Sequence, residues 1–472
     1  MEGSTNSITN DYTEIVRRLP CKLKISYGVG HVLNDICASM WFTYLLVFFH
    51  LVLGFSAILS GIILLIGQIA DALATPFVGL HSDKNDDFWL CRYGRRKTWH
   101  LLGTVCILVS FPFIFSPCIN CEGSHQWAQV IYYSGFVIIF QFGWAAVQIS
   151  HLSLIPDLTP TEHERTELTA IRYSFTVFAN VLVYCIIWGV LHVTSGTADS
   201  QIGPKDVHHF QTVVLIGLFV GTITSLIFHF GVKEGPLCDT TGPLRRNTRS
   251  AGTLLKDIQL YQVAGVYMPT RLFVNLSQVY VPLYLHESLN MAATSLATIP
   301  LTMFISSFAA SLVIEKLNTN LGRKIAYAIG VILGIGACLW IRLGSGETYV
   351  TYEIYPVSML LGTGGSIMLV TSLGVTADLI GQSTESGAFV YGVMSFTDKL
   401  SNGLVVGVIQ SIHSHGPKFF SRYYRDVLTF ACGGAARSDD IDNICFHFSL
   451  EQSEQNNSSI KNGTILITKY LE

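Results

Sequence analysis

The sequence predicts an all-α membrane protein made of two repeated halves, with about eleven transmembrane helices in total. Half of its 472 residues are hydrophobic and 13% are charged, whereas soluble domains carry about 25% charged residues. Each apolar segment is long enough, or nearly so, to cross a bilayer as a helix. Polar motifs recur between the two halves at offsets of 221 and 228 residues, which indicates an internal repeat.

The predicted spans are separated by short loops, with one longer polar interruption after the sixth span. They lie at residues 24–53, 56–80, 98–117, 127–155, 166–193, 210–232, 260–286, 293–315, 324–343, 350–379 and 385–413. The resulting organisation is a cytosolic N-terminal tail at 1–22, an N-terminal six-helix half at 23–232, a cytosolic central loop at 233–259, a C-terminal half at 260–432, and a polar, disordered tail at 433–472.

The distribution of Lys and Arg residues sets the orientation, because cytosolic loops carry an excess of both. They are concentrated in the N-terminal tail and in the loops after even-numbered spans, so we expect those segments in the cytosol. The apolar run Val427–Cys432 is too short for a twelfth span. We therefore expect a groove where a twelfth helix would pack, and a lumenal tail with glycosylation sequons at Asn456, Asn457 and Asn462.

The internal repeat keeps polar residues in register, which chance similarity between apolar segments does not explain. It relates spans 4 and 5 to spans 10 and 11, and span 2 to span 8, so each half is a six-helix unit and the twelfth helix is missing. The matching positions are Asp157 with Asp378, residues 174–176 with 395–397, and residues 94–97 with 322–324.

Charged and polar side chains lie deep inside several spans, where an unpaired charge costs about 2.5–3.5 kcal/mol on insertion scales. Three acids and three bases balance one another, as a desolvated cavity between helices would require. Any one of these charged residues could instead belong to a structural ion pair that only holds helices together. The candidate solute-binding or coupling residues are His31, Asn34, Asp35, Asp71, Gln148, Arg172, Arg271, Asn275, Asp398 and Lys399.

Asp398 and Lys399 stand next to each other in the middle of the last predicted span. Adjacent residues on a helix point about 100° apart, so these two side chains cannot pair face to face. We therefore expect each to have a partner on another helix.

The loop after span 2 pairs an acid with a basic cluster, which suggests a cytosolic latch formed by Asp83, Arg95 and Arg96. Simple anchoring of the span by positive charge is the alternative. In a short loop, Cys118 and Cys121 could form a disulfide, but a second pair of ligands for a metal site is absent from the sequence. The N-terminal tail contains a tyrosine-type sorting signal, Tyr12–Ile15, that could bind a sorting adaptor.

The composition and motifs also exclude several functions. A net charge of −3 gives no indication of nucleic-acid binding. The sequence contains no nucleophile–base pair and no His, Cys, Asp or Glu cluster at catalytic spacing, so we expect neither an enzyme nor a cofactor.

The two-fold six-helix repeat and the Gly79-x-x-x-Asp83…Gly94-Arg-Arg-Lys97 loop resemble the major facilitator superfamily. The acids of spans 1 and 2, with Arg172 and Lys399, resemble its glycoside–pentoside–hexuronide cation symporter branch. That resemblance implies Asp35 as a solute contact and Asp71 with Lys399 as the coupling centre. The branch carries a second acid where this chain has Thr75, which argues against sodium coupling and leaves proton coupling or none.

Longer motifs resemble a lysosomal and melanosomal group of the superfamily that imports cysteine into those organelles and affects pigmentation. They include residues 31–45, 111–118, 141–144, 150–157 and 385–413. The resemblance implies alternating-access transport of cysteine from the cytosol into such an organelle. Arg172 or Arg271 would hold the carboxylate of cysteine and Asp35 its ammonium group. The alternatives are a proton- or cation-coupled sugar symporter and a non-transporting truncated isoform or membrane scaffold.

Overall fold

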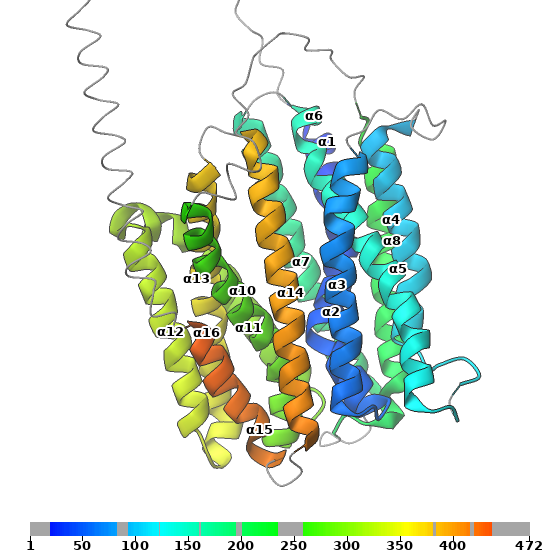
Figure 1. The fold of residues 1–472 in the computed structure, drawn as a ribbon, viewed down its shortest axis with the longest axis vertical. Coiled ribbons are helices and arrows are strands. Elements are labelled where there is room, and N and C mark those ends of the chain that lie inside the picture. The colour runs from blue at the N-terminus through cyan, green and yellow to red at the C-terminus, as the bar shows by residue number, and fades with distance from the viewer. Residues whose placement is uncertain are drawn as a thin grey trace, which may run out of the picture.

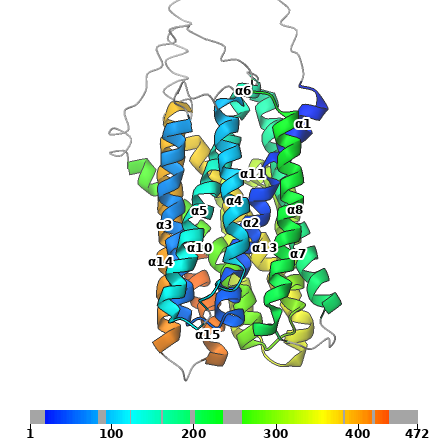
Figure 2. The same cartoon turned by 90° about the vertical axis from the view of Figure 1, so that its right-hand side faces the viewer.

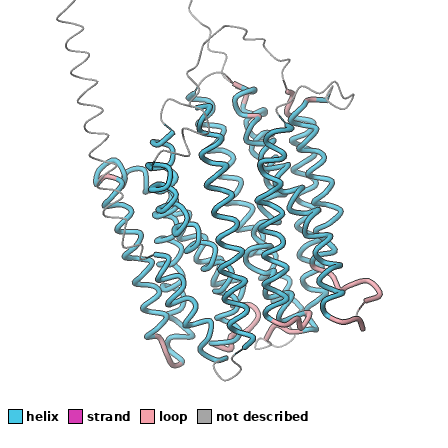
Figure 3. Tube along the Cα trace, in the orientation of Figure 1, coloured by secondary structure: helices cyan, strands magenta, loops and turns pink. Residues whose placement is uncertain are grey.

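The computed structural model describes residues 19–82, 93–121, 123–159, 162–194, 201–234, 258–380, 384–415 and 420–436. Throughout these ranges the chain is helical, with short connecting loops and no strand (Figure 3). The helices of the N-terminal half are α1 (Cys21–Gly28), α2 (Val32–Val47), α3 (Ala57–Ser82), α4 (Arg95–Ile114), α5 (Gln126–Ser153), α6 (Ile155–Leu158), α7 (Glu162–Thr194) and α8 (Val207–Gly231). Those of the C-terminal half are α10 (Ile258–Leu283), α11 (Ser295–Leu321), α12 (Arg323–Leu343), α13 (Ile354–Ile380), α14 (Thr384–His415), α15 (Phe420–Asp426) and α16 (Gly433–Ala436).

Long helices occupy every one of the predicted spans, and among the described residues nine are apolar and long enough to cross a membrane by length and composition. The two long helices outside this set, α10 and α14, carry Arg271 and the Asp398–Lys399 pair. The first span is composite, because α1, η1 (Val29–His31), α2 and η2 (Phe48–Val52) follow one another without a break. The predicted all-α membrane bundle is therefore confirmed.

The helices form two groups that lie side by side (Figure 1). The N-terminal half occupies the right of that view and the C-terminal half the left, with α14 next to α3. The same two helices are neighbours in the perpendicular view (Figure 2), and they pack together along their lengths. Further contacts between the halves join α7 to α11 and α2 to α10. Two of these contacts, α3 with α14 and α2 with α10, join helices that both carry predicted site residues.

Glycines allow the closest helix approaches inside each half, as is usual where helices associate in lipid. A Cβ atom on Gly143 of α5 would lie 2.8 Å from the carbonyl oxygen of Gly103 on α4. In the C-terminal half, a Cβ on Gly364 of α13 would lie 2.8 Å from the backbone nitrogen of Gly334 on α12. Both distances are too short for a real side chain, so these positions require glycine.

Residues Phe420–Ala436 form one helical segment, made of α15, η8 (Val427–Cys432) and α16. It packs against α10 and α12, while α15 contacts the π-helical turn η5 (Tyr284–Ser288) at the end of α10. At about 1.5 Å per residue the segment is roughly 25 Å long, so it fills much of the groove that we expected to be open. The prediction of an open groove was wrong because the helical segment begins among polar residues before Val427, where the sequence has no apolar run.

Two further differences concern the ends of this segment and a short loop. The helix extends through α16 to Ala436, past the predicted start of the tail at 433, and the rest of the tail, with its three sequons, lies outside the described residues. Cys118 and Cys121 form a disulfide in the loop between α4 and α5, with Cα atoms 5.4 Å apart. The spacing of these cysteines had left that pairing open.

Replacing Gly362 on α13 with Ala is expected to lower stability, because the new Cβ would overlap the backbone carbonyl of Met303 on α11. Overpacking of this kind costs about 1–3 kcal/mol. The matched control is Gly336→Ala on α12, where a Cβ meets nothing within 4 Å. Thermal unfolding of the two purified variants in detergent should show a lower melting temperature for Gly362→Ala only, and equal melting temperatures would contradict this packing account.

Candidate functional site

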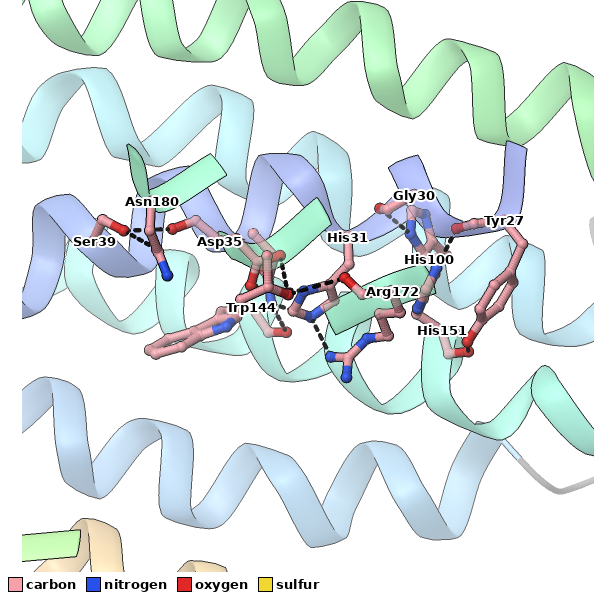
Figure 4. Close-up of polar contacts among 12 residues, drawn as sticks. Tyr27, Gly30, His31, Asp35, Ser39, His100, Trp144, His151, Arg172 and Asn180 are labelled. Carbon is pink, nitrogen blue, oxygen red and sulfur yellow. Dashed lines mark hydrogen bonds and ion pairs between the residues drawn. The ribbon is translucent and has the colours of Figure 1, made fainter. Parts of the chain in front are cut away.

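The first group of predicted residues lies inside the N-terminal half, around the start of α2 (Figure 4). His31 and Asp35 are one helical turn apart and face the same side, with His31 Nδ1 3.0 Å from Asp35 Oδ1. The other ring nitrogen of His31, Nε2, is 3.1 Å from the Arg172 guanidinium on α7 and 3.2 Å from the amide nitrogen of Asn34. Four predicted site residues from α2, η1 and α7 therefore form one contact group.

Asp35 has a partner on each of its two carboxylate oxygens. Oδ1 faces His31, and Oδ2 accepts a hydrogen bond from the Thr176 hydroxyl at 2.9 Å. The side chain is only 9% exposed. Next to it, Ser39 donates to Asn180 of α7 and to the Asp35 backbone carbonyl. A solute cation could reach the Asp35 carboxylate only by taking the place of Thr176 or His31.

The second group joins the two halves. Lys399 Nζ on α14 lies 2.7 Å from Asp71 Oδ1 on α3 and donates to the Thr75 hydroxyl, also at 2.7 Å. Thr75 in turn donates to Asp71 Oδ1 at 3.2 Å. Both charged side chains are buried, at 3% exposure for Asp71 and 13% for Lys399. Buried charges are tolerated only when they are paired. This ion pair therefore restricts the position of α14 relative to α3.

Thr75 occupies the place where the resembled symporters have a second acid, and the structure shows what replaces that acid. The threonine hydroxyl accepts from Lys399 and donates to Asp71, so the ammonium group lies between these two side chains. A cation is thus already supplied by the chain at this position. Whether transport needs sodium stays a prediction.

The third group lies within the C-terminal half. Arg271 Nε on α10 is 2.9 Å from Asp398 Oδ2 on α14, and the Asn402 amide donates to Asp398 Oδ1 at 2.5 Å. Asp398 is 5% exposed, whereas Arg271 is 28% exposed. This contact uses Nε of the guanidinium, so its two terminal nitrogens keep the fork geometry that binds a carboxylate.

Asp398 and Lys399 therefore have partners on two different helices, as the sequence predicted. Asp398 pairs with α10 inside its own half, and Lys399 pairs with α3 across the interface. The 100° turn between neighbouring helical residues directs the two side chains to these separate partners. Through this pair of residues, α14 links the charge groups of the two halves.

A cavity of about 130 Å³ lies between α7 of the N-terminal half and α10, α11 and α13 of the C-terminal half. Aliphatic, aromatic, thioether, hydroxyl and amide side chains line it, and none of the lining residues in the described part of the chain is charged. Gln278 lies two turns of α10 beyond Arg271, on the same face. The lining residues with rings, sulfur or polar groups include Tyr173, Ser277, Gln278, Met303, Phe304 and Ser366.

The remaining predicted residues take no part in the contacts given above, or lie beyond the described part of the chain. Asn275 is buried on α10, and Gln148 is half-buried on α5. Asp83, the Tyr12–Ile15 signal and the sequons at Asn456, Asn457 and Asn462 lie outside the described residues.

The basic end of the proposed latch has acidic partners that the sequence did not indicate. Arg96 pairs with Asp157 at 2.6 Å, and the backbone N–H groups of Arg96 and Lys97 donate to the Glu234 carboxylate. Arg95 begins the same helix, α4. A carboxylate at a helix N-terminus is stabilising because it neutralises the unpaired N–H groups there. Glu234 thus ties the start of α4 to the chain that follows α8.

Two sets of contacting residues were not predicted as groups, because neither follows a helical period. One is a network of buried histidines in the N-terminal half. His151 Nε2 is 2.8 Å from the Tyr27 carbonyl, His100 Nε2 is 3.1 Å from that of Gly30, and His100 Nδ1 is 3.1 Å from His229 Nε2. The other set brings together His50, Glu287 and His413 at the far ends of three helices. Only their positions at predicted span ends could have drawn attention to the second set.

Comparison with known proteins gives a consistent result. The chain is 46% identical to major facilitator superfamily domain-containing protein 12 of Homo sapiens, over 84% of this chain and 86% of the human one. It is 44% identical to the protein of the same name from Mus musculus, over 89% and 91% of the two chains. The crystal structure of a D-xylose-proton symporter superimposes with a TM-score of 0.62 over 88% of this chain and 97% of that one, at 15% identity, which shows a shared fold.

A family model described as MFS/sugar transport protein matches residues 26–413. That range begins in α1 and ends within α14, so it contains all three charge groups and the cavity. The family match, the two relatives and the shared fold all indicate a membrane transporter. The internal repeat of the sequence and the buried charges inside the membrane helices are consistent with that result. The chain is a multi-pass membrane transporter, and it belongs to the MFS/sugar transport protein family.

Proposed function

We propose that this transporter moves cysteine from the cytosol into lysosomes or melanosome-like organelles by alternating access. The observation that carries the proposal is the buried Asp71–Lys399 ion pair, which joins the two halves inside the membrane. A membrane scaffold has no need of a costly buried charge pair at the interface of its halves. A transporter does, because a contact between the halves that can break and re-form couples solute binding to their relative motion.

The charge groups suit a zwitterion of small size. Arg271 would hold the solute carboxylate with its terminal nitrogens while Nε stays on Asp398. Asp35 would exchange Thr176 for the solute ammonium group. Arg172 is the second candidate for the carboxylate, but its contact with His31 places it in the group that contains Asp35. The division of Arg271 and Asp35 between the halves would let one bound solute contact both.

The cavity supports a small solute with an apolar or sulfur-bearing side chain. Its volume of about 130 Å³ is well below the roughly 300–1,000 Å³ of pockets for drug-sized ligands. Met303 and Phe304 supply a thioether and a ring, and sulfur packs favourably against both polarisable and aromatic groups. Ser277, Gln278 and Ser366 supply polar contacts without charge. A thiol side chain would fit this lining.

A sugar symporter is the second candidate, and the sugar-transport description of the matching family favours it. Sugars need several hydroxyl and amide partners on neutral surfaces, which the serines and Gln278 of the cavity could supply. The paired charges around Arg271 and Asp35 would then have no ionic group to bind. The two candidates therefore differ in whether a zwitterion is required.

Cystine accumulation in purified lysosomes distinguishes the candidates, because imported cysteine would oxidise to cystine there. Cells lacking their own cysteine import should accumulate labelled cystine several-fold faster when they express this chain. Labelled xylose supplied to the same lysosomes is the parallel arm. Xylose uptake with unchanged cystine would favour the sugar symporter, and no gain in either solute at a confirmed lysosomal location would reject both assignments.

Removing one member of the inter-half ion pair is expected to abolish transport and lower stability. In Asp71→Asn, Lys399 is left as an uncompensated buried charge, which costs about 3–5 kcal/mol. The double variant Asp71→Asn/Lys399→Gln removes both charges, so its melting temperature should return toward wild type while its uptake stays absent. Full uptake in the double variant would show that the pair is only structural.

Transport is expected to be independent of sodium, because Lys399 already lies between Asp71 and Thr75. Uptake by proteoliposomes in choline buffer should equal uptake in sodium buffer at the same membrane potential. The same measurement with Lys399→Gln shows whether uptake becomes dependent on sodium once the ammonium group between Asp71 and Thr75 is removed. A several-fold loss of wild-type uptake in choline would contradict this reading of the site.

A further inference from the structure

A half-buried acid and two histidines lie at the ends of three helices. The distribution of Lys and Arg residues places these helix ends on the side away from the cytosol. His50 Nε2 is 3.3 Å from Glu287 Oε1, and His413 Nε2 is 3.5 Å from Glu287 Oε2. Exposure is 21% for the His50 side chain, 16% for Glu287 and 3% for His413. His50 belongs to the N-terminal half, whereas Glu287 and His413 belong to the C-terminal half. The carboxylate therefore bridges the two halves on the extracytosolic side.

The hydrogen bond made by the other ring nitrogen of His50 determines in which protonation state this bridge is attractive. Nδ1 of His50 lies 2.8 Å from the backbone carbonyl of Phe55. A carbonyl only accepts hydrogen bonds, so Nδ1 must carry the proton in a neutral ring, and Nε2 then presents a lone pair. A lone pair facing a carboxylate is repulsive. The contact with Glu287 is attractive only when His50 carries a second proton on Nε2.

Glu287 keeps its negative charge over the pH range in which an imidazole titrates. Burial raises the pKa of this carboxyl group, but the contacts with His413 and with the protonated ring of His50 outweigh burial and lower the pKa to about 2. In the described part of the chain, the titratable groups near it include His286 beside it on η5, and Tyr423, Tyr424 and Arg425 on α15. The rings of Tyr423 and Tyr424 pack on His413 at centroid distances of 4.8 and 5.1 Å.

A second contact between the halves lies next to the first and needs no added proton. Nε2 of His286 is 3.0 Å from the backbone carbonyl of Ile202, so a neutral ring can donate this hydrogen bond. His286 and Glu287 are consecutive residues of the same π-helical turn. The chain thus offers two adjacent histidine contacts between the halves, of which only the one through His50 depends on charge.

We propose that Glu287 and His50, with His413, form a proton-binding site that holds the extracytosolic ends of the two halves together at acidic pH. The ligand is a single proton on His50 Nε2, taken from the extracytosolic compartment, and no bond other than N–H is formed. The closed arrangement binds this proton more tightly than the open one, so acid favours closure. The closing effect is present below the ordinary imidazole pKa of about 6.5 and is lost as the pH rises through the titration of His50.

The position of the site in the fold explains how one proton could change the conformation. His50 lies in η2 and Glu287 in η5, the π-helical turns that end the first helix of each half. Such turns are frequent at functional sites in helices. The same face carries the Tyr44 hydroxyl bond to the Leu296 carbonyl at 2.8 Å. A contact at these helix ends therefore acts on the surfaces that must separate when the transporter opens to the extracytosolic side.

Double electron–electron resonance on the full chain in lipid nanodiscs tests the site without any solute. Nitroxides on keto-bearing noncanonical residues replacing His208 and Glu347, one exposed position near the extracytosolic end of each half, leave the native cysteines in place. Raising the pH from 5.0 to 7.5 should increase the ratio of long to short distances about three- to tenfold, within the tenfold per pH unit that one proton allows. An unchanged ratio would overturn the proposal.

The variants His50→Gln and Glu287→Gln should each remove this pH response, since neither can form a proton-dependent ion pair. His286→Gln is the matched control and should keep it, because the Ile202 contact does not depend on charge. Melting temperatures of the variants show that each is folded. A pH response that survives in both His50→Gln and Glu287→Gln, or that disappears only in His286→Gln, would overturn the assignment to His50. Since no solute is present, the outcome is independent of whether cysteine is the transported molecule.

Discussion

The Asp71–Lys399 ion pair is the interaction on which the arrangement of the two halves depends. Each charge alone would cost several kcal/mol at membrane depth, and removing either partner leaves the other uncompensated. The pair therefore holds α3 and α14 in one register along their shared length. With the chain's own ammonium group placed between Asp71 and Thr75, the interface is neutral without a bound ion. Any motion that separates these helices must supply new partners for both charges.

The need of each buried charge for a partner also determines the contacts in the other two charge groups. Asp35 is satisfied by His31 and Thr176, and Asp398 by Arg271 and Asn402. Each acid thus has two partners, one a helical turn away on its own helix and one on another helix. The side chains of Asp35, Asp71, Asp398 and Lys399 are at most 13% exposed, whereas Arg271 is 28% exposed and Arg172 is also half-buried. A negatively charged solute group would therefore meet Arg271 before it disturbed the saturated contacts around Asp35.

Much of the fold was predictable from the sequence, because bilayer length and apolar composition determine where helices can span. The partners of Asp398 and Lys399 were predictable as a requirement but not by identity, since helix pairing depends on the three-dimensional arrangement. Thr75 illustrates the limit: the sequence showed a missing acid, and only the structure showed Lys399 bound to the threonine hydroxyl. The helix at Phe420–Ala436 and the Glu287 site were missed because polar residues, isolated at span ends, leave no periodic signal.

Counterflow of labelled cysteine tests the central claim most directly, because it needs solute binding and movement of the halves but no gradient of any ion. Proteoliposomes containing the full chain and loaded with unlabelled cysteine should transiently accumulate the labelled solute, and those containing Asp71→Asn/Lys399→Gln should not. Absence of counterflow with the wild-type chain, or equal counterflow in the double variant, would contradict an account in which this ion pair couples the two halves during cysteine transport.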